Sequence, residues 1–388
     1  MKRRISKVPF FRLRLGTPEK RAVSRVIESG WVTSGPTARA LEEKIKKLVH
    51  ARYAIAVSSA TAGLHLSLKA AGIGTGDEVI TSPYTMAATV EAILYTGATP
   101  VFAEIDPLTL NIDPAQVAKR ISRRTEAIIP VDIAGLPCDY DALLKIARQR
   151  KVLLIEDAAH SLGAQFQSKP VGSWCDATVF SFYSTKNITT GEGGMVVTDS
   201  KILASRARLL SLHGMTSSGW KRYAGGGWKY DIVELGYKYN LSDLAAGLGL
   251  GQLTRFGEMQ KKREMLAKRY IENLSRLGAF IETPYIDARS RHGWHLFIIK
   301  IIPERLRITR DRFISELEKR GIGCGVHFIP IYRFSYFRKH LKLKISDFSA
   351  TESAYQRVIS LPFYPDLAFG EVDYVSERIA ELCRKFCR

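Results

Sequence analysis

Between residues 50 and 215, short apolar runs alternate with amphipathic stretches, and this alternation constrains the fold more than any other feature. The runs have the length and β-branched content of buried strands. They are YAIAV (53–57), EVIT (78–81), TPVFAEI (99–105), AIIPV (127–131), VLLIE (152–156), ATVFSF (177–182) and MVVT (195–198). Helical patterns at 61–72, 87–97 and 139–150 separate the earlier runs. The pattern predicts an α/β fold with a mostly parallel sheet, and the closely spaced last three runs leave room for antiparallel pairing.

The pattern changes after this region. Residues 241–278 have the pattern of a long helical segment that could bridge two lobes. From about residue 285 a smaller α/β unit follows, with a strand at 294–302 and then a helix at 309–321. We therefore predict a large domain of mixed, mostly parallel sheet over residues 1–250, and a linking helix with a small C-terminal α/β domain over 251–388.

The formal charge of +20 has two interpretations. It favours an anionic partner, such as nucleic acid, an acidic membrane or a phosphorylated substrate, or it reflects a basic surface without a specific partner. Lysine and arginine are spread along the whole chain, and no zinc-finger, RNP or bZIP signature is present. We therefore predict no nucleic-acid partner. No apolar run reaches the roughly 18–20 residues that a bilayer requires, so no membrane span is predicted either.

The five cysteines are odd in number and scattered, which argues against a disulfide framework and for a reducing compartment. Because no long apolar segment follows the basic N-terminus, the predicted location is cytoplasmic. Cys383 and Cys387 lie one helical turn apart without a second pair, and His292 and His295 lack nearby partners. We predict no metal site, and a packing or substrate role for the two histidines.

The stretch SSATAG (58–63) has the composition of a helix start that can hold a phosphate. Ser58 or Ser59 would cap the helix, and the small residues Thr61 and Ala62 leave backbone N–H groups uncovered. Such an end carries about half a positive charge together with free donors. On this stretch alone, a capped helix without a ligand remains the simpler interpretation.

Two further polar residues follow strands of the predicted sheet. Asp157 comes directly after VLLIE, with His160 three residues later, and Lys186 ends ATVFSFYSTK. Ligands of open α/β sheets bind at the carboxyl ends of the strands. Taken singly, Asp157 could merely cap the next segment and Lys186 could be a solvated loop residue. Together they provide the three groups that a pyridoxal 5′-phosphate (PLP) site requires: a desolvated amine, a carboxylate and a phosphate-binding helix start.

Ordered motifs over nearly the whole chain also resemble one enzyme family. The motifs are SSATAG, SPYTMAATVEAI, IEDAAHSLGA, FSFYSTKNITTGEGGMVVTD, GYKYNLSDLAA and GIGCGVHF. They resemble the DegT-like sugar-nucleotide aminotransferases, which are PLP-dependent transferases of fold type I. Within that family, IEDAAH, KNIT, GYKYNL and WHLFIIK are most similar to the branch that makes UDP-4-amino-4-deoxy-L-arabinose.

The resemblance implies a role for each matching residue around the cofactor. Lys186 would form the Schiff base, Asp157 would hold the pyridinium nitrogen, and His160 would lie near the phenolic oxygen. The remaining contacts implied are to the cofactor phosphate, from Thr61, Ala62, Ser181 and Asn240. Asn240 would reach the phosphate of a neighbouring subunit, which implies a homodimer with shared active sites.

The resemblance also implies residues around the ring and the substrate. Met86 stands where the family usually places an aromatic over the cofactor ring; a thioether can pack there, although an ordinary core residue fits the position as well. His327 would line the sugar-nucleotide side. Lys221, Arg222 and Lys229, in GWKRYAGGGWKYD, are candidates to neutralise a diphosphate on a flexible lid, unless they are ordinary solvated lysines and arginine.

By resemblance, the predicted function is transamination of a nucleotide-linked keto sugar, expected to be a UDP-4-keto sugar, with glutamate as amino donor. The product would be an amino sugar nucleotide for a cell-surface glycan or for lipid A modification. Three alternatives stay open: another keto sugar, sugar dehydration on the same fold, and a non-catalytic regulatory or nucleic-acid-binding protein. Lys186 argues against dehydration, because a related dehydratase branch has histidine at that position.

Overall fold

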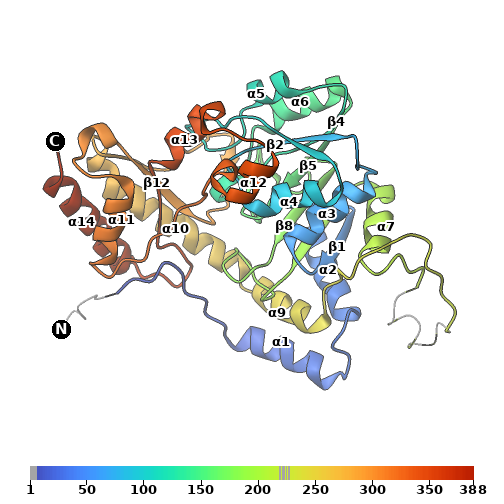
Figure 1. Cartoon of the computed structure of the whole chain (residues 1–388). Helices are drawn as coiled ribbons and strands as arrows, with labels where there is room; N and C mark the ends of the chain where they lie inside the picture. The colour runs from blue at the N-terminus through green and yellow to red at the C-terminus, as the bar shows by residue number, and fades with distance from the viewer. Residues whose placement is uncertain (1–6, 218–219, 221–222, 224, 226–227) are drawn as a thin grey trace.

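The computed structural model describes residues 7–388 except 218–219, 221–222, 224 and 226–227. Its described residues form one large sheet covered by helices and a smaller sheet near the C-terminus (Figure 1). Within the described part of the chain, no helix combines the length and the apolar character needed to cross a membrane.

The large sheet has seven strands in the order β1-β9-β8-β5-β4-β2-β3. The strands are β1 (Tyr53–Val57), β2 (Glu78–Thr81), β3 (Thr99–Phe102), β4 (Thr125–Ile129), β5 (Leu153–Asp157), β8 (Ala177–Ser181) and β9 (Gly194–Thr198). Strand β9 pairs antiparallel with both β1 and β8, and the other neighbours pair parallel. The predicted α/β class with a mixed, mostly parallel sheet is therefore confirmed.

Helices cover both faces of this sheet, because successive strand residues point to opposite faces. Ile55 and Val57 belong to the core beneath one set of helices, α3 (Ala60–Ala70), α4 (Ala87–Tyr95) and α7 (Lys201–Leu210). Ala54 and Ala56 belong to the core of the other face, beneath α2 (Pro36–Leu48), α5 (Pro114–Arg120) and α6 (Tyr140–Arg150). Helix α1 (Thr17–Glu28) precedes them and packs on α9 (Asp243–Leu253).

The smaller sheet is antiparallel and has the order β10-β12-β13. Its strands are β10 (Ile281–Glu282), β12 (Phe297–Ile301) and β13 (Val358–Leu361), packed with α11 (Arg310–Glu318) and α14 (Phe369–Lys385). Short segments complete the chain: β6 (Gln165–Phe166) with β7 (Lys169–Pro170) and β11 (Ser290–Arg291), and then α12 (Ser335–His340) and α13 (Ser349–Tyr355).

The N-terminal segment packs with this smaller unit, although the sequence suggested the large one. Val8 is fully buried in the small core and forms a parallel bridge with Ile322. Its N–H donates to the carbonyl of Gly321 at 2.8 Å. The chain therefore passes from the small unit to the large one before the first helix, and a division near residue 250 stays a prediction.

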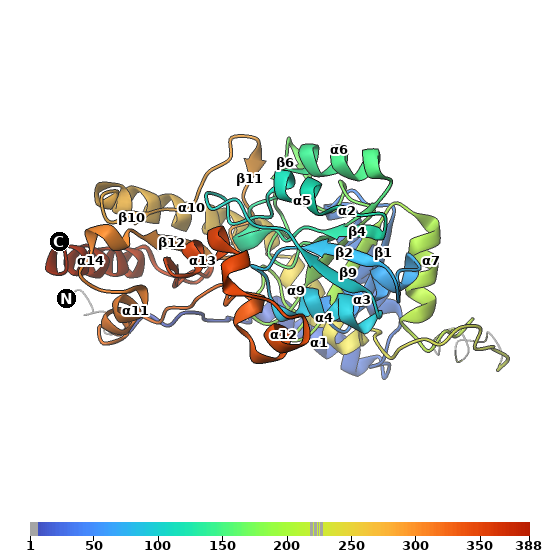
Figure 2. The same ribbon diagram turned by 45° about the horizontal axis from the view of Figure 1, so that its top comes forward.

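The helical segment expected at 241–278 is two helices, α9 and α10 (Phe256–Leu274), with a break at residues 254–255. Phe256 and Met259 belong to a core cluster of the large unit, whereas Leu266 and Tyr270 belong to the core of the small unit. Figures 1 and 2 both show α10 running from the large unit to α11 and α14. The expected bridging helix is thus α10 alone.

Candidate active site

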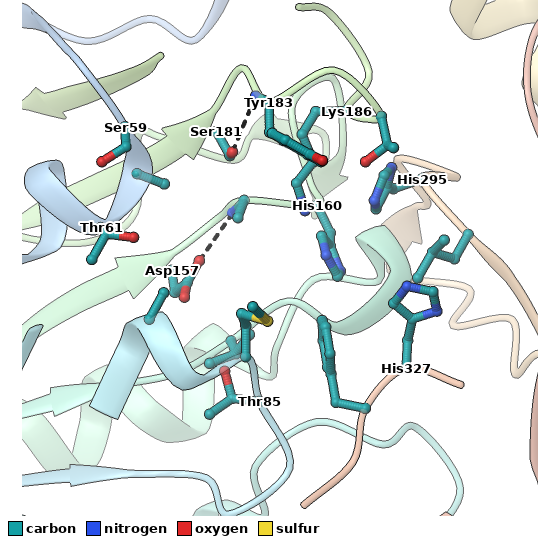
Figure 3. Close-up of a pocket in the computed structure, with 18 of the residues that line it drawn as sticks. Ser59, Thr61, Thr85, Asp157, His160, Ser181, Tyr183, Lys186, His295 and His327 are labelled. Atoms are coloured by element: carbon teal, nitrogen blue, oxygen red, sulfur yellow. Dashed lines mark hydrogen bonds between the residues drawn. The ribbon is translucent and has the colours of Figure 1, made fainter. Parts of the chain in front are cut away.

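A cavity of about 430 Å³ lies at the carboxyl ends of β5 and β8, between the large sheet and the small unit (Figure 3). Parallel strands bring their carboxyl ends to one edge of a sheet, so residues far apart in the sequence meet there. Seven of the predicted site residues line the cavity: Thr61, Met86, Asp157, His160, Ser181, Lys186 and His327.

Lys186 lies five residues beyond the end of β8, and its backbone N–H donates to the carbonyl of Tyr183 at 2.9 Å. This turn directs the side chain into the cavity (Figure 3). Burial lowers the pKa of the Lys186 amine to about 8, and the nearby Asp157 charge opposes that shift. The amine therefore loses its proton more readily than an ordinary lysine, as a nucleophilic lysine requires.

Asp157 is the last residue of β5 and is buried. Its Oδ2 accepts from Thr89 Oγ1 at 2.8 Å, and its Oδ1 accepts from the Ala159 N–H at 3.2 Å. Burial raises the pKa of the carboxyl, while these hydrogen bonds and Lys186 act in the opposite direction. A protonated ring nitrogen placed beside Asp157 would also favour the ionised form, so the carboxylate fits the predicted pyridinium partner.

A threonine chain that the sequence analysis missed supports Asp157. Thr85, which lines the cavity, shares a 2.7 Å hydrogen bond with Thr89, and Thr89 donates to the carboxylate. Thr85 lies just before the N-cap of α4, and Thr89 lies four residues later in the first turn of the helix. That spacing in SPYTMAATVE was the available signal.

His160 presents a hydrogen-bond donor to the cavity. Its Nδ1 accepts from the Ala134 N–H at 3.2 Å. Burial, reinforced by Lys186 and His327, holds the pKa of His160 well below its usual range, so the ring is neutral. In a neutral imidazole whose Nδ1 accepts, the proton lies on Nε2. His160 therefore has a donor for a phenolic oxygen, and the contact itself stays a prediction.

The start of α3 forms one end of the cavity, where Ser59, Thr61 and Ser181 lie together (Figure 3). Ser59 caps the helix by accepting from the Ala62 N–H at 3.0 Å. Ala62 does not line the cavity and its N–H is already used, so its phosphate contact stays a prediction.

The glycines of the GEGG turn permit this arrangement. A Cβ on Gly194 would lie 2.7 Å from the backbone carbon of Ser59 and 2.8 Å from the backbone nitrogen of Ala60. Real Cβ atoms essentially never approach so closely. Strand β9 can therefore run against the helix start only because residue 194 has no side chain.

The small unit and the N-terminal segment supply the opposite side of the cavity; sequence reasoning placed His327 there and offered a packing or substrate role for His295, which also lines it. The additional lining residues are Phe10, Phe11, His295, Leu296, Phe328 and Phe363. The Phe10 ring stacks on His327 with centroids 5.6 Å apart, and His327 Nδ1 lies 2.9 Å from Ser360 Oγ. Burial, with a contribution from Lys186, lowers the pKa of His327 to about 4.

The other predicted residues lie elsewhere. Asn240 lines a second cavity of about 370 Å³, where its side-chain amide donates to Ser34 Oγ. Lys229 is exposed, with its ammonium 5.8 Å from the ring centroid of Trp228. Lys221 and Arg222 lie outside the described residues. Their roles at the substrate or at a neighbouring subunit stay predictions.

Comparison with known proteins gives a consistent result. The model of the DegT/DnrJ/EryC1/StrS aminotransferase family matches residues 14–380. The chain is 43% identical over 372 residues to the spore coat polysaccharide biosynthesis protein SpsC of Bacillus subtilis, covering 95% of each chain.

Two solved structures are also similar over nearly their full lengths. A provisionally named sugar aminotransferase from Streptococcus pneumoniae, solved in PLP and PMP forms, has a TM-score of 0.91 at 31% identity, covering 98% of this chain and 99% of that one. PseC of Helicobacter pylori, an aminotransferase of pseudoaminic acid biosynthesis, has a TM-score of 0.89 at 28% identity with the same coverage.

The chain therefore belongs to the DegT/DnrJ/EryC1/StrS aminotransferase family. The predicted enzyme class, an aminotransferase, is confirmed, and so is the predicted family. The predicted cofactor is the one present in the solved relatives.

Proposed function

We propose that this enzyme uses PLP to transfer an amino group from glutamate to a keto sugar carried on a nucleoside diphosphate. The observation that carries the proposal is the meeting of Lys186, Asp157 and the α3 start in one cavity. A partly neutral amine, a buried carboxylate and a capped helix start match the aldehyde, ring nitrogen and phosphate of PLP.

When bound, PLP supplies a ring that accepts the electrons released at the substrate carbon. Lys186 would move the proton between the substrate carbon and the cofactor carbon, work that contributes about 10²–10⁴-fold in rate. Asp157 would keep the ring nitrogen protonated, and His160 would donate to the phenolic oxygen. Ser59, Thr61 and Ser181 would orient the phosphate at the helix start.

Support for a sugar substrate comes from the relatives. The Bacillus subtilis protein is named for polysaccharide biosynthesis, and PseC for pseudoaminic acid biosynthesis. The formal charge of +20 suits a diphosphate. Neither relative is named for UDP-4-amino-4-deoxy-L-arabinose, so we keep the UDP-4-keto sugar as the first acceptor to test and favour a cell-surface glycan over lipid A as the destination.

We also propose a cytoplasmic homodimer. Asn240 lies at the second cavity rather than beside Lys186, as a residue reaching another subunit would. In the sequence shortly before Asn240, the large apolar side chains of Tyr223, Trp228 and Leu235 are 80–87% exposed. Large apolar side chains exposed to this degree favour an interface.

The test is incubation with PLP, glutamate and a panel of UDP-, GDP- and dTDP-linked keto sugars, read by mass spectrometry. We expect at least one sugar to gain an amine, and borohydride to fix the cofactor on the peptide containing Lys186. Loss of water without gain of nitrogen would show a dehydratase instead. A tag on another peptide would contradict the assignment of Lys186.

A further inference from the structure

A small, strongly basic cavity adjoins the main one, and Phe11 and Lys186 line both. Its described lining includes four arginines, Arg12, Arg14, Arg255 and Arg263, against one acidic residue, Asp366. Its volume is about 30 Å³. That is roughly the space of one water molecule in the liquid, which admits a group no larger than a single carboxylate and excludes a diphosphate.

Arg263 of α10 is the most unusual member of this arginine pocket, because it is only 2% exposed. It donates to the carbonyls of Trp294 at 3.0 Å and His295 at 3.4 Å. Its Nε is buried without a partner, and no carboxylate among the described residues forms an ion pair with it. A buried cation without a counter-ion is costly, so an anion nearby would stabilise this arrangement.

The other charges of the pocket leave this cation uncompensated. Arg255 lies 3.6 Å from Glu19 and Arg12 lies 3.8 Å from Glu371, both beyond hydrogen-bond distance. Asp366 would oppose an anion, and its buried Oδ2 has no partner in the described part of the chain. Four arginines against the three carboxylates of Asp366, Glu19 and Glu371 still leave the pocket positive.

We propose that the arginine pocket binds a carboxylate group of the amino donor. The inference rests on the proposed function, in which the donor is glutamate. The pocket begins at Lys186, which is where the donor's amino group must arrive, and guanidinium groups are the side chains best suited to a carboxylate. The keto sugar brings a diphosphate, which is too large for this pocket, so we assign the pocket to the donor half of the reaction.

The experiment separates the two half-reactions of the holoenzyme by following the cofactor absorbance in single turnovers. In Arg12→Gln and Arg263→Lys, we expect kcat/KM for glutamate to fall about ten- to a hundredfold, the usual effect of losing a hydrogen bond between charged groups. The reaction of the aminated enzyme with keto sugar should be unchanged. Asp366→Asn should shift the donor reaction in the opposite direction, towards a lower KM.

The matched control is Arg269→Gln, because Arg269 lies on the same helix but is exposed and paired with Asp373. It should leave both half-reactions unchanged. An independent measurement is the rise in the melting temperature of the holoenzyme when glutarate is added at constant ionic strength. Arg12→Gln should make this rise smaller.

Equal loss in both half-reactions, or an unchanged donor reaction in Arg12→Gln and Arg263→Lys, would overturn the proposal and leave the pocket as a site for water. If the unaltered enzyme converts no amino donor at all, the proposed function fails instead.

Discussion

The two sides of the active-site cavity are built in different ways. The strand-end wall, comprising Asp157, His160, Ser181 and Lys186, comes from contiguous motifs at the edge of one sheet. The outer wall, comprising Phe10, Phe11, His295, His327, Phe328 and Phe363, joins the two ends of the chain. The first wall carries the groups that can do chemistry, and the second is mostly aromatic. Chemistry and substrate selection should therefore respond separately to substitution.

The largest effect is expected on the strand-end wall, from Lys186→Ala. Turnover should fall by about 10⁴-fold, because the proton-transferring amine is removed. The rate is measured as amine formed on the sugar, with circular dichroism to show that the fold persists. A normal rate in this variant would show that the strand-end wall does not carry the chemistry.

Next comes Asp157→Asn, which keeps the shape and the hydrogen bond from Thr89 but removes the charge. Turnover should fall by about 10²–10³-fold, as when one preorganised electrostatic contact is lost. Thr89→Val is the companion variant, and it should lower turnover less because the carboxylate stays. Should Asp157→Asn and Thr89→Val have equal effects, the charge would not be the important property.

Attachment of PLP to cofactor-free enzyme should follow the ionisation of Lys186. Burial lowers the pKa of this amine to about 8, and only the neutral amine is nucleophilic. The rate should rise about tenfold per pH unit below pH 8 and level off above it. Stopped-flow absorbance across pH 6–10 measures this; a rise that continues to pH 10 would mean that the strand-end wall does not desolvate Lys186.

The smallest effect on the chemistry is expected from the outer wall. Phe10→Leu removes the ring that stacks on His327. It should raise KM for the keto sugar about tenfold, within the range for altered apolar pocket contacts, with kcat for the saturated enzyme nearly unchanged. Steady-state kinetics over sugar concentration give both constants. A fall in kcat with an unchanged KM would mean that the outer wall also shapes the reacting geometry.

Periodicity predicts what is local in this fold. The runs at 53–57 and 78–81 coincide with β1 and β2, because strand patterning depends on neighbouring residues. The position of β9 between β1 and β8 depends on pairing between distant segments, which no local pattern records. The packing of Val8 beside Ile322 was not predicted, because these two residues are also far apart in the sequence.

The site residues also fall into two groups, those that local motifs predict and those that depend on packing between distant segments. Lys186 and Asp157 were predictable because Asp157 ends a recognisable strand, Lys186 follows one closely, and both match motifs. Phe10 was not, because its partner His327 lies more than 300 residues away in the sequence. Arg263 looked like any surface arginine of an amphipathic helix, and only the packed structure shows that it is buried.

Helix α10 contributes apolar side chains to the cores of both units, from Phe256 at one end to Tyr270 at the other. Neither unit can lose its structure without exposing part of the other's interior to water. We therefore expect the two units to melt in one transition, so that a destabilising substitution in the C-terminal sheet also lowers the melting temperature of the region around Lys186.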